Sequence, residues 1–199
     1  VQPASAQLFQ PDEDSPLITN VVADPAETQL TSNCTWKITP GNDNYSYNQE
    51  FIDAGNELGA LIDGDQTTYW HSDPTGPNLH NQDLYIQVDL KRTDIQKFFY
   101  RYDRRADVYN GSVRRGIMWT KIEIKATNTP EDNSSWVQVA VHSDLPSEAI
   151  EDGWPYTPPM VSMSEPYRYL RFYARDSNQP YWCFSEFQMY PATEINDPR

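Results

Sequence analysis

Cysteine, glycine and cationic side chains are all scarce in this chain of 199 residues. Its two cysteines, Cys34 and Cys183, form no Cys-x-x-Cys pair, so neither a zinc site nor a dithiol redox site is predicted. Only 15 Lys and Arg oppose 29 Asp and Glu, and a net charge of −14 repels phosphate backbones and anionic lipid. No apolar run is long enough to cross a membrane. We therefore predict no nucleic acid partner and no membrane insertion.

Common catalytic motifs are lacking as well. The sequence has no Gly-x-Ser-x-Gly elbow, no phosphate-binding loop and no His-Glu-x-x-His motif. Because 29 acidic residues are present, a pair of catalytic carboxylates is still compatible with the sequence, so a small β-sandwich polysaccharide lyase or hydrolase stays open as an alternative. We predict that the chain is not an enzyme, and that any catalytic domain belongs to another part of a parent protein.

Aromatic and proline residues are plentiful. Aromatic residues make up 13% of the chain, which supplies a core built from few, large side chains. Sixteen Pro against eight Gly favour ordered loops and leave little room for long helices. A helical period extends over one or two turns at most, in residues 48–58.

Alternation of apolar and polar residues is the dominant pattern, and it predicts strands with one buried face. The alternating segments are "TWKIT" (35–39), "LYIQVDL" (84–90), "TKIEIKA" (120–126), "WVQVAV" (136–141), "YLRFYA" (169–174) and "SEFQMY" (185–190). Long connections over roughly 71–83, 103–119 and 143–166 separate some of them. Short strands joined by turn-rich loops predict an all-β sandwich or barrel, whose long loops are the usual place for function.

The expected organisation has three parts. Residues 1–33 contain four prolines and scattered acids, which favours an extended leader or linker. Within it, "LITNVVA" (17–23) is a candidate short strand that either packs on the domain or belongs to a neighbouring one. The β-sandwich is expected over 34–191, and a short tail over 192–199.

The stretch "LIDGDQTTYWHS" (61–72) is unusually rich in oxygen-bearing and aromatic side chains. It is not a calcium-sensor loop, because the sixth and twelfth positions counted from Asp63 hold Thr68 and Pro74 instead of Gly and Glu. Two interpretations remain: an Asp-Gly turn capped by its own side chains, or a less regular calcium site using carboxylate, hydroxyl and carbonyl oxygens.

Six segments together resemble the discoidin family, which includes the C-type domains of coagulation factors and the galactose-binding modules of bacterial glycosidases. In chain order they are "ALIDGDQTTYWHS", "LYIQVDL" with the Arg-bearing loop after it, "IEIKAT", "WVQV", "YRYLRFYA" and "FSEFQMY". The likeness covers about residues 34–190 and is greatest to the family-thirty-two carbohydrate-binding modules. It implies an antiparallel jelly-roll β-sandwich of about eight strands, similar to galactose-binding domains, in an extracytoplasmic protein that is secreted, periplasmic or at the cell surface.

The resemblance also implies a structural calcium ion, which many members of the family hold. Carried over by position, its ligands are the carbonyls of Ala60, Asp65 and Ser185, the carboxylates of Asp63 and Glu186, and Thr68. Trp70 becomes a core residue beneath this loop. The first and last strands of the family lie side by side, which favours a bridge between Cys34 and Cys183, although two buried free thiols remain the alternative.

A sugar site is implied by matches to relatives that bind galactose. His71 in "YWHS", Arg104 in "YDRRAD" and Asn110 in "YNGS" match the residues that reach the ligand, and Arg105 takes the place of Arg104 in an alternative alignment. An arginine fork donates to two neighbouring hydroxyls, and a histidine takes one hydroxyl.

A sugar ring also needs an aromatic side chain to stack on its C–H face. Tyr181 and Trp182 in "NQPYWC" are the candidates for this ring, with Tyr109 and Trp154 as further candidates. Each residue also has an ordinary structural interpretation. His71 is then a surface histidine, Arg104 part of a surface ion-pair cluster, Asn110 the turn residue of an Asn-Gly pair, and each aromatic side chain a packed ring.

The chain is therefore expected to be a non-catalytic module that binds galactose-type or related glycans and tethers a larger secreted or cell-surface protein to them. The alternative within the same fold is a cell-surface adhesion domain that binds protein, with other domains of a parent chain as candidate partners.

Overall fold

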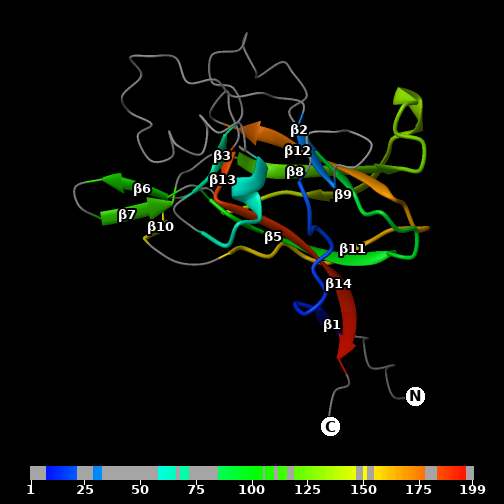
Figure 1. Ribbon diagram of the computed structural model, residues 1–199, viewed down its shortest axis with the longest axis horizontal. Helices are drawn as coiled ribbons and strands as arrows, with labels where there is room; N and C mark the ends of the chain where they lie inside the picture. Colours follow the sequence, from blue (N-terminus) through cyan, green and yellow to red (C-terminus); the bar gives the residue numbers. More distant parts are fainter. Residues whose placement is uncertain are drawn as a thin grey trace.

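The computed structural model describes residues 8–21, 29–32, 58–65, 68–71, 85–104, 106–109, 112–115, 119–146, 150–151, 155–177 and 183–195. Within them, two antiparallel sheets face each other as a β-sandwich (Figure 1). The five-stranded sheet has the order β2 (Leu30–Ser32), β4 (Tyr85–Asp89), β12 (Tyr169–Ser177), β8 (Trp119–Thr127) and β9 (Val137–His142). The four-stranded sheet has the order β1 (Leu8–Pro11), β14 (Glu186–Ile195), β5 (Lys97–Asp103) and β11 (Val161–Ser162).

Smaller elements decorate one end of the sandwich (Figure 1). They are the three-stranded sheet β10 (Ile150–Glu151), β7 (Ser112–Arg115) and β6 (Ala106–Tyr109), and the pair β13 (Cys183–Phe184) and β3 (Trp70–His71). Among the described residues, short 3-10 helices are η2 (Leu58–Leu61) and η4 (Asn133–Ser135). No helix among the described residues has the length and apolar character needed to span a membrane. Two of the predicted long connections contain short strands of their own: β6 and β7 lie within 103–119, and β10 and β11 lie within 143–166.

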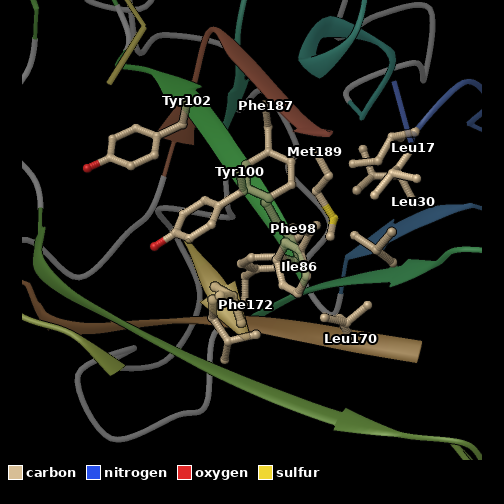
Figure 2. Close-up of a cluster of buried hydrophobic side chains, with 14 of the residues drawn as sticks. Leu17, Leu30, Ile86, Phe98, Tyr100, Tyr102, Leu170, Phe172, Phe187 and Met189 are labelled. Atoms are coloured by element: carbon tan, nitrogen blue, oxygen red, sulfur yellow. The ribbon is translucent and has the colours of Figure 1, made fainter. Parts of the chain in front are cut away.

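The core lies between the two sheets and combines aliphatic side chains with large aromatic rings. Figure 2 shows Phe98 and Tyr100 of β5 meeting Phe172 of β12 and Phe187 of β14. All four side chains are fully buried. The centroid of the Phe172 ring lies 5.0 Å from that of Phe187 and 5.1 Å from that of Tyr100. Rings that pack edge to face contribute beyond their buried area. The sandwich is therefore joined by a continuous aromatic layer.

The alternation in the sequence is confirmed where it can be compared. In β4, Ile86 and Val88 are buried while Tyr85 and Gln87 lie on the other face, as a period of two requires. The segments predicted at 84–90, 120–126, 136–141, 169–174 and 185–190 all fall on strands. "TWKIT" lies outside the described residues. The all-β antiparallel sandwich is confirmed, while β5, one of the two inner strands of its sheet, is not among the segments that the alternation predicts.

The expected domain boundaries are corrected by the structure. Part of the presumed leader is integral to the sandwich: β1 pairs with β14, β2 pairs with β4, and Leu17 and Ile18 are 5% and 1% exposed within the core. Likewise β14 continues to Ile195 through part of the presumed tail. The prolines and acids that suggested a linker are compatible with short edge strands, where a missing N–H does little harm. The described residues of "LITNVVA" pack on the domain without forming a strand.

Candidate functional site

A tight loop follows η2 and forms one corner of the sandwich. Gly64 adopts a φ of +76°, a conformation that side chains rarely tolerate, and the chain reverses there. One carboxylate oxygen of Asp63 accepts the backbone N–H of Asp65 at 2.8 Å, and the other accepts the hydroxyl of Thr68. The Thr68 hydroxyl also lies 3.0 Å from the carbonyl oxygen of Asp65. These bonds close the loop on itself and gather several oxygen atoms at its centre.

The loop is fastened to the last part of the chain by strand pairing. Beyond Thr68 the chain enters β3, which pairs with β13 so that Trp70 lies opposite Phe184 and His71 opposite Cys183. The rings of Trp70 and Phe184 stack at 6.5 Å, and both are at most 2% exposed. The expected core position of Trp70 is thus confirmed. Because Ser185 and Glu186 come directly after β13, the pairing brings them to the same corner.

Asp63 and Glu186 meet at this corner. Burial of Glu186, its hydrogen bond to the Asp63 carboxyl and the nearby charge of Asp103 raise the pKa of Glu186 to about 9. Its other carboxyl oxygen, Oε1, is buried and has no hydrogen-bond partner within the described part of the chain. A buried carboxylate without a partner is costly, and a carboxyl held next to another acid is stabilised only by a proton or by a cation.

The donor set at this corner has the chemistry of a calcium site. Ala60 and Ser185 are 0% exposed, so their backbone lies inside the corner, while Asp63 and Asp65 lie on its outer side. Among the described residues, no group of three or more His, Cys, Asp or Glu side chains is placed to hold a metal ion. Calcium accepts carbonyl and hydroxyl oxygens as readily as carboxylates, so two carboxylates with neutral oxygens around them still suit it. The chemistry of these residues is therefore compatible with the calcium ion that the family resemblance implies, which stays a prediction.

Arg104, expected to bind sugar, is largely buried beside this corner. Its side chain is 6% exposed, and its Nη1 donates to the carbonyl oxygen of Pro146 at 3.0 Å. Its own carbonyl oxygen accepts the hydroxyl of Ser185 at 3.2 Å. Arg104 therefore links the start of the 103–119 connection to the segment before β10 and to the end of β13. Little of its guanidinium is available to a ligand.

The remaining expected ligand residues are only partly placed. The backbone of His71 belongs to β3 at the same corner, in register with Cys183. Arg105, Asn110, Tyr181 and Trp182 lie outside the described residues, as does the partner that the resemblance suggested for Cys183. The sugar-contacting role of these side chains stays a prediction.

Asp103 is a further member of the corner that the sequence did not indicate as functional. It is 2% exposed, lies opposite Glu186 in the β5–β14 ladder and adds to the negative field at that carboxyl. Its carbonyl oxygen accepts the N–H of Ser185 at 2.9 Å. In the sequence it was visible only as an acid before Arg104. The pairing of β5 with β14, which gives it a role, could not be read from the sequence.

No family model matches the chain and no curated protein matches it. Its fold, in contrast, is similar to that of solved sugar-binding modules. Chitosan-binding module 1 of a chitosanase/glucanase from Paenibacillus sp. IK-5 gives a TM-score of 0.51 at 16% identity, covering 88% of this chain and 98% of that one. The CBM32-3 module of a family 31 glycoside hydrolase from Clostridium perfringens gives 0.52 at 18%, covering 82% and 91%. The chain thus has the fold of the family 32 carbohydrate-binding modules.

Proposed function

We propose that this chain is a non-catalytic carbohydrate-binding module that attaches a larger extracytoplasmic protein to galactose-type or related glycans. The observation that supports it most is the shared fold, which extends over most of the chain and nearly all of the two solved modules. The loop corner at β3 adds a rigid base, because strand pairing fixes it to the core. His71 would meet the sugar there, together with Arg105 and Asn110 of the 103–119 connection.

Calcium is the second part of this proposal. The ion would be held by Asp63 and Glu186, with Thr68 and the carbonyls of Ala60, Asp65 and Ser185 completing its shell. The partnerless Oε1 of Glu186 and the raised pKa of its carboxyl support a cation there. The ion would supply positive charge and rigidity to the corner. Through Asp63 and Glu186 the ion would bridge the loop after η2 and β14.

Isothermal titration with galactose, N-acetylgalactosamine and chitosan oligosaccharides, in calcium-containing buffer, tests the proposed function. A single shallow site should bind its sugar with a Kd on the order of 0.1–1 mM and gain strength through multivalency. His71→Ala should abolish this binding, while Glu131→Ala, an exposed residue of the turn before η4, should leave it unchanged. Absence of binding to all of these sugars and to a glycan array, or equal binding by the His71 variant, would overturn the proposal.

A further inference from the structure

The outer face of the five-stranded sheet is a second, cationic surface on this acidic chain. Along β8 and β12, the side chains that point away from the core include four cations, Lys121, Lys125, Arg171 and Arg175, and one carboxylate, Glu123. The whole chain has a net charge of −14. The positive charge on this face is therefore a local excess. It would attract anionic ligands that the rest of the surface repels.

Aromatic rings lie beneath three of these cations, and Glu123 also pairs with Lys125 at 3.8 Å and with Arg175 at 2.9 Å. The guanidinium carbon of Arg171 lies 3.9 Å from the centroid of the Trp136 ring and 4.3 Å from that of Tyr85. Tyr173 is 4% exposed although it is not part of the core cluster, because Lys125 and Arg175 lie over its ring at 5.1 Å and 4.7 Å. Cations fixed over rings lose little side-chain freedom when they bind an anion.

Arg171 is the central cation of this face, and within the described part of the chain no carboxylate pairs with it. Its Nε donates to Oε1 of Gln87 at 3.0 Å, and its Nη1 reaches the hydroxyl of Tyr173 at 3.5 Å. A guanidinium has five N–H donors, so these two contacts leave about three for water or a ligand. The rings occupy its flat faces, and its edge retains the fork geometry that suits a carboxylate.

A row of polar side chains passes through Arg171 and crosses all five strands. In the order of the strands, its members are Thr31, Gln87, Arg171, Lys125 and Gln138, each opposite the next in the sheet register. We call this set the polar row. Neighbouring strands are about 4.8 Å apart, so the row repeats a hydrogen-bonding side chain at that interval. Its third and fourth positions are charged, and the other three carry amide or hydroxyl groups.

The mixed chemistry of the row distinguishes between two classes of acidic polymer. An acidic peptide offers mainly carboxylates, which would leave the amide and hydroxyl groups of the row without matching partners. A uronate polysaccharide offers several hydroxyls for each carboxylate, which matches a row of two cations and three neutral polar side chains. The amides of Gln87 and Gln138 suit hydroxyls, whereas Arg171 and Lys125 suit carboxylates.

We propose that the polar row binds an acidic polysaccharide of uronate residues, which lies across the five-stranded sheet at a site separate from the loop corner. The inference goes beyond the proposed function, because it concerns another face and another ligand chemistry. A module with two such faces would hold a glycan surface at two points.

The test uses a tetramer of β-1,4-linked glucuronate and its neutral counterpart, cellotetraose, in isothermal titration at low salt. Glucuronate tetramer should bind, cellotetraose should not bind measurably, and the affinity for the former should fall as salt rises. Arg171→Gln and Lys125→Gln should each weaken binding by about tenfold, as expected for loss of a charge-assisted bond. Arg92→Gln removes one positive charge from an exposed turn outside the row and should leave the affinity unchanged.

Two further measurements guard against misinterpretation. Lys125 has a side chain that is 30% exposed, so its variant should keep the melting temperature of the parent protein even if Arg171→Gln unfolds. His71→Ala should leave glucuronate binding intact, which separates failure of this proposal from failure of the loop-corner site. No binding of the tetramer, unchanged affinity in the Lys125 variant, equal binding of cellotetraose, or equally tight binding of a glutamate decapeptide would each overturn the proposal.

Discussion

Glu186, at the start of β14, hydrogen bonds through its carboxyl group to Asp63, in the loop that follows η2. The contact joins the loop after η2 to β14, the last strand of the sandwich. It also places two carboxyl groups side by side at a site where burial disfavours the ionised form of Glu186. Without a cation the corner keeps a proton on Glu186 at neutral pH, since the pKa of this carboxyl is raised to about 9.

Glu186→Gln should therefore separate the stability of the metal-free protein from its response to calcium. The amide can still donate to Asp63, so in chelator the melting temperature at pH 7 should match that of the parent protein within about 2 °C. In the parent protein, calcium should add RT ln(1 + [Ca]/Kd) to the free energy of unfolding, about 2.7 kcal/mol at a hundredfold excess over Kd. The melting temperature should rise accordingly. The variant should lose this rise, because a neutral amide is a poorer ligand than a carboxylate.

Glu194→Gln is the matched control, since Glu194 is exposed near the far end of the same strand. It should keep the full response to calcium. Differential scanning fluorimetry in chelator and in calcium measures all three proteins. A parent protein that gains nothing from calcium would contradict the metal proposal, even if sugar still binds.

A second prediction concerns Asp89, which accepts a forked pair of hydrogen bonds from Arg168 Nε at 2.7 Å and Nη2 at 3.0 Å. Burial opposes ionisation of this carboxyl, but the bonds from Arg168 and from the Lys91 backbone outweigh it and lower the pKa of Asp89. Asp89→Asn should lower the free energy of unfolding by about 1–2 kcal/mol at pH 7.

The pH dependence of this loss follows from the lowered pKa. Stability from Asp89 is present above its ordinary pKa of 3.8 and disappears as the pH falls toward the folded value. Urea unfolding from pH 7 to pH 3 should thus show parent and variant converging in acid. Asp94→Asn breaks the same type of fork, to Arg92, where both side chains are exposed, and it should not change the unfolding midpoint measurably. A gap between parent and Asp89→Asn that does not begin to shrink below pH 3.8 would contradict this assignment.

A third prediction concerns His142, whose Nδ1 lies 2.7 Å from the hydroxyl of Tyr100 in the core. Burial lowers the pKa of His142, so the folded protein favours the neutral ring. The contribution of the neutral His142 ring to the free energy of unfolding is therefore fully present above the ordinary pKa of 6.5. It decreases as the pH falls through the lower folded value.

Nuclear magnetic resonance titration of the ring protons should give His142 a midpoint below 6.5, and Tyr100→Phe should move that midpoint. The buried tyrosine hydroxyl needs its acceptor, so His142→Phe should cost about 1–3 kcal/mol at neutral pH and make stability less dependent on pH between 5 and 7. A midpoint at or above the ordinary value would show that the ring is not held neutral by burial.

The sequence predicted much of the fold because alternation is a local property. Ile86 and Val88 alternate with polar neighbours whatever strand pairs with theirs, and the buried face follows. Leu17 and Ile18 were harder to assign, since a short apolar pair among prolines looks the same in a linker and in a core edge. Strand order, in contrast, depends on long-range pairing, so no local pattern revealed that Asp103 lies opposite Glu186.

The same distinction applies to the two candidate surfaces. The loop corner was foreseen through resemblance, which linked Asp63 to Glu186 before any pairing was known. The polar row was not foreseen, because Gln87, Arg171 and Lys125 come from three separate strands and only the register of the sheet aligns them. A sequence shows the members of such a row as ordinary outward-facing residues.

The last prediction tests the assignment of the two faces of β5. Phe98 and Phe99 are adjacent, but Phe98 is 0% exposed and lies 6.5 Å from the ring of Phe172, whereas Phe99 is half-buried on the other face. Phe98→Ala should lower the free energy of unfolding by about 3–5 kcal/mol, because it leaves a cavity between the sheets. Phe99→Ala removes the same atoms from a partly hydrated site and should cost well under half as much. Equal losses in urea unfolding would mean that both faces of β5 are packed, which would place further chain against the four-stranded sheet.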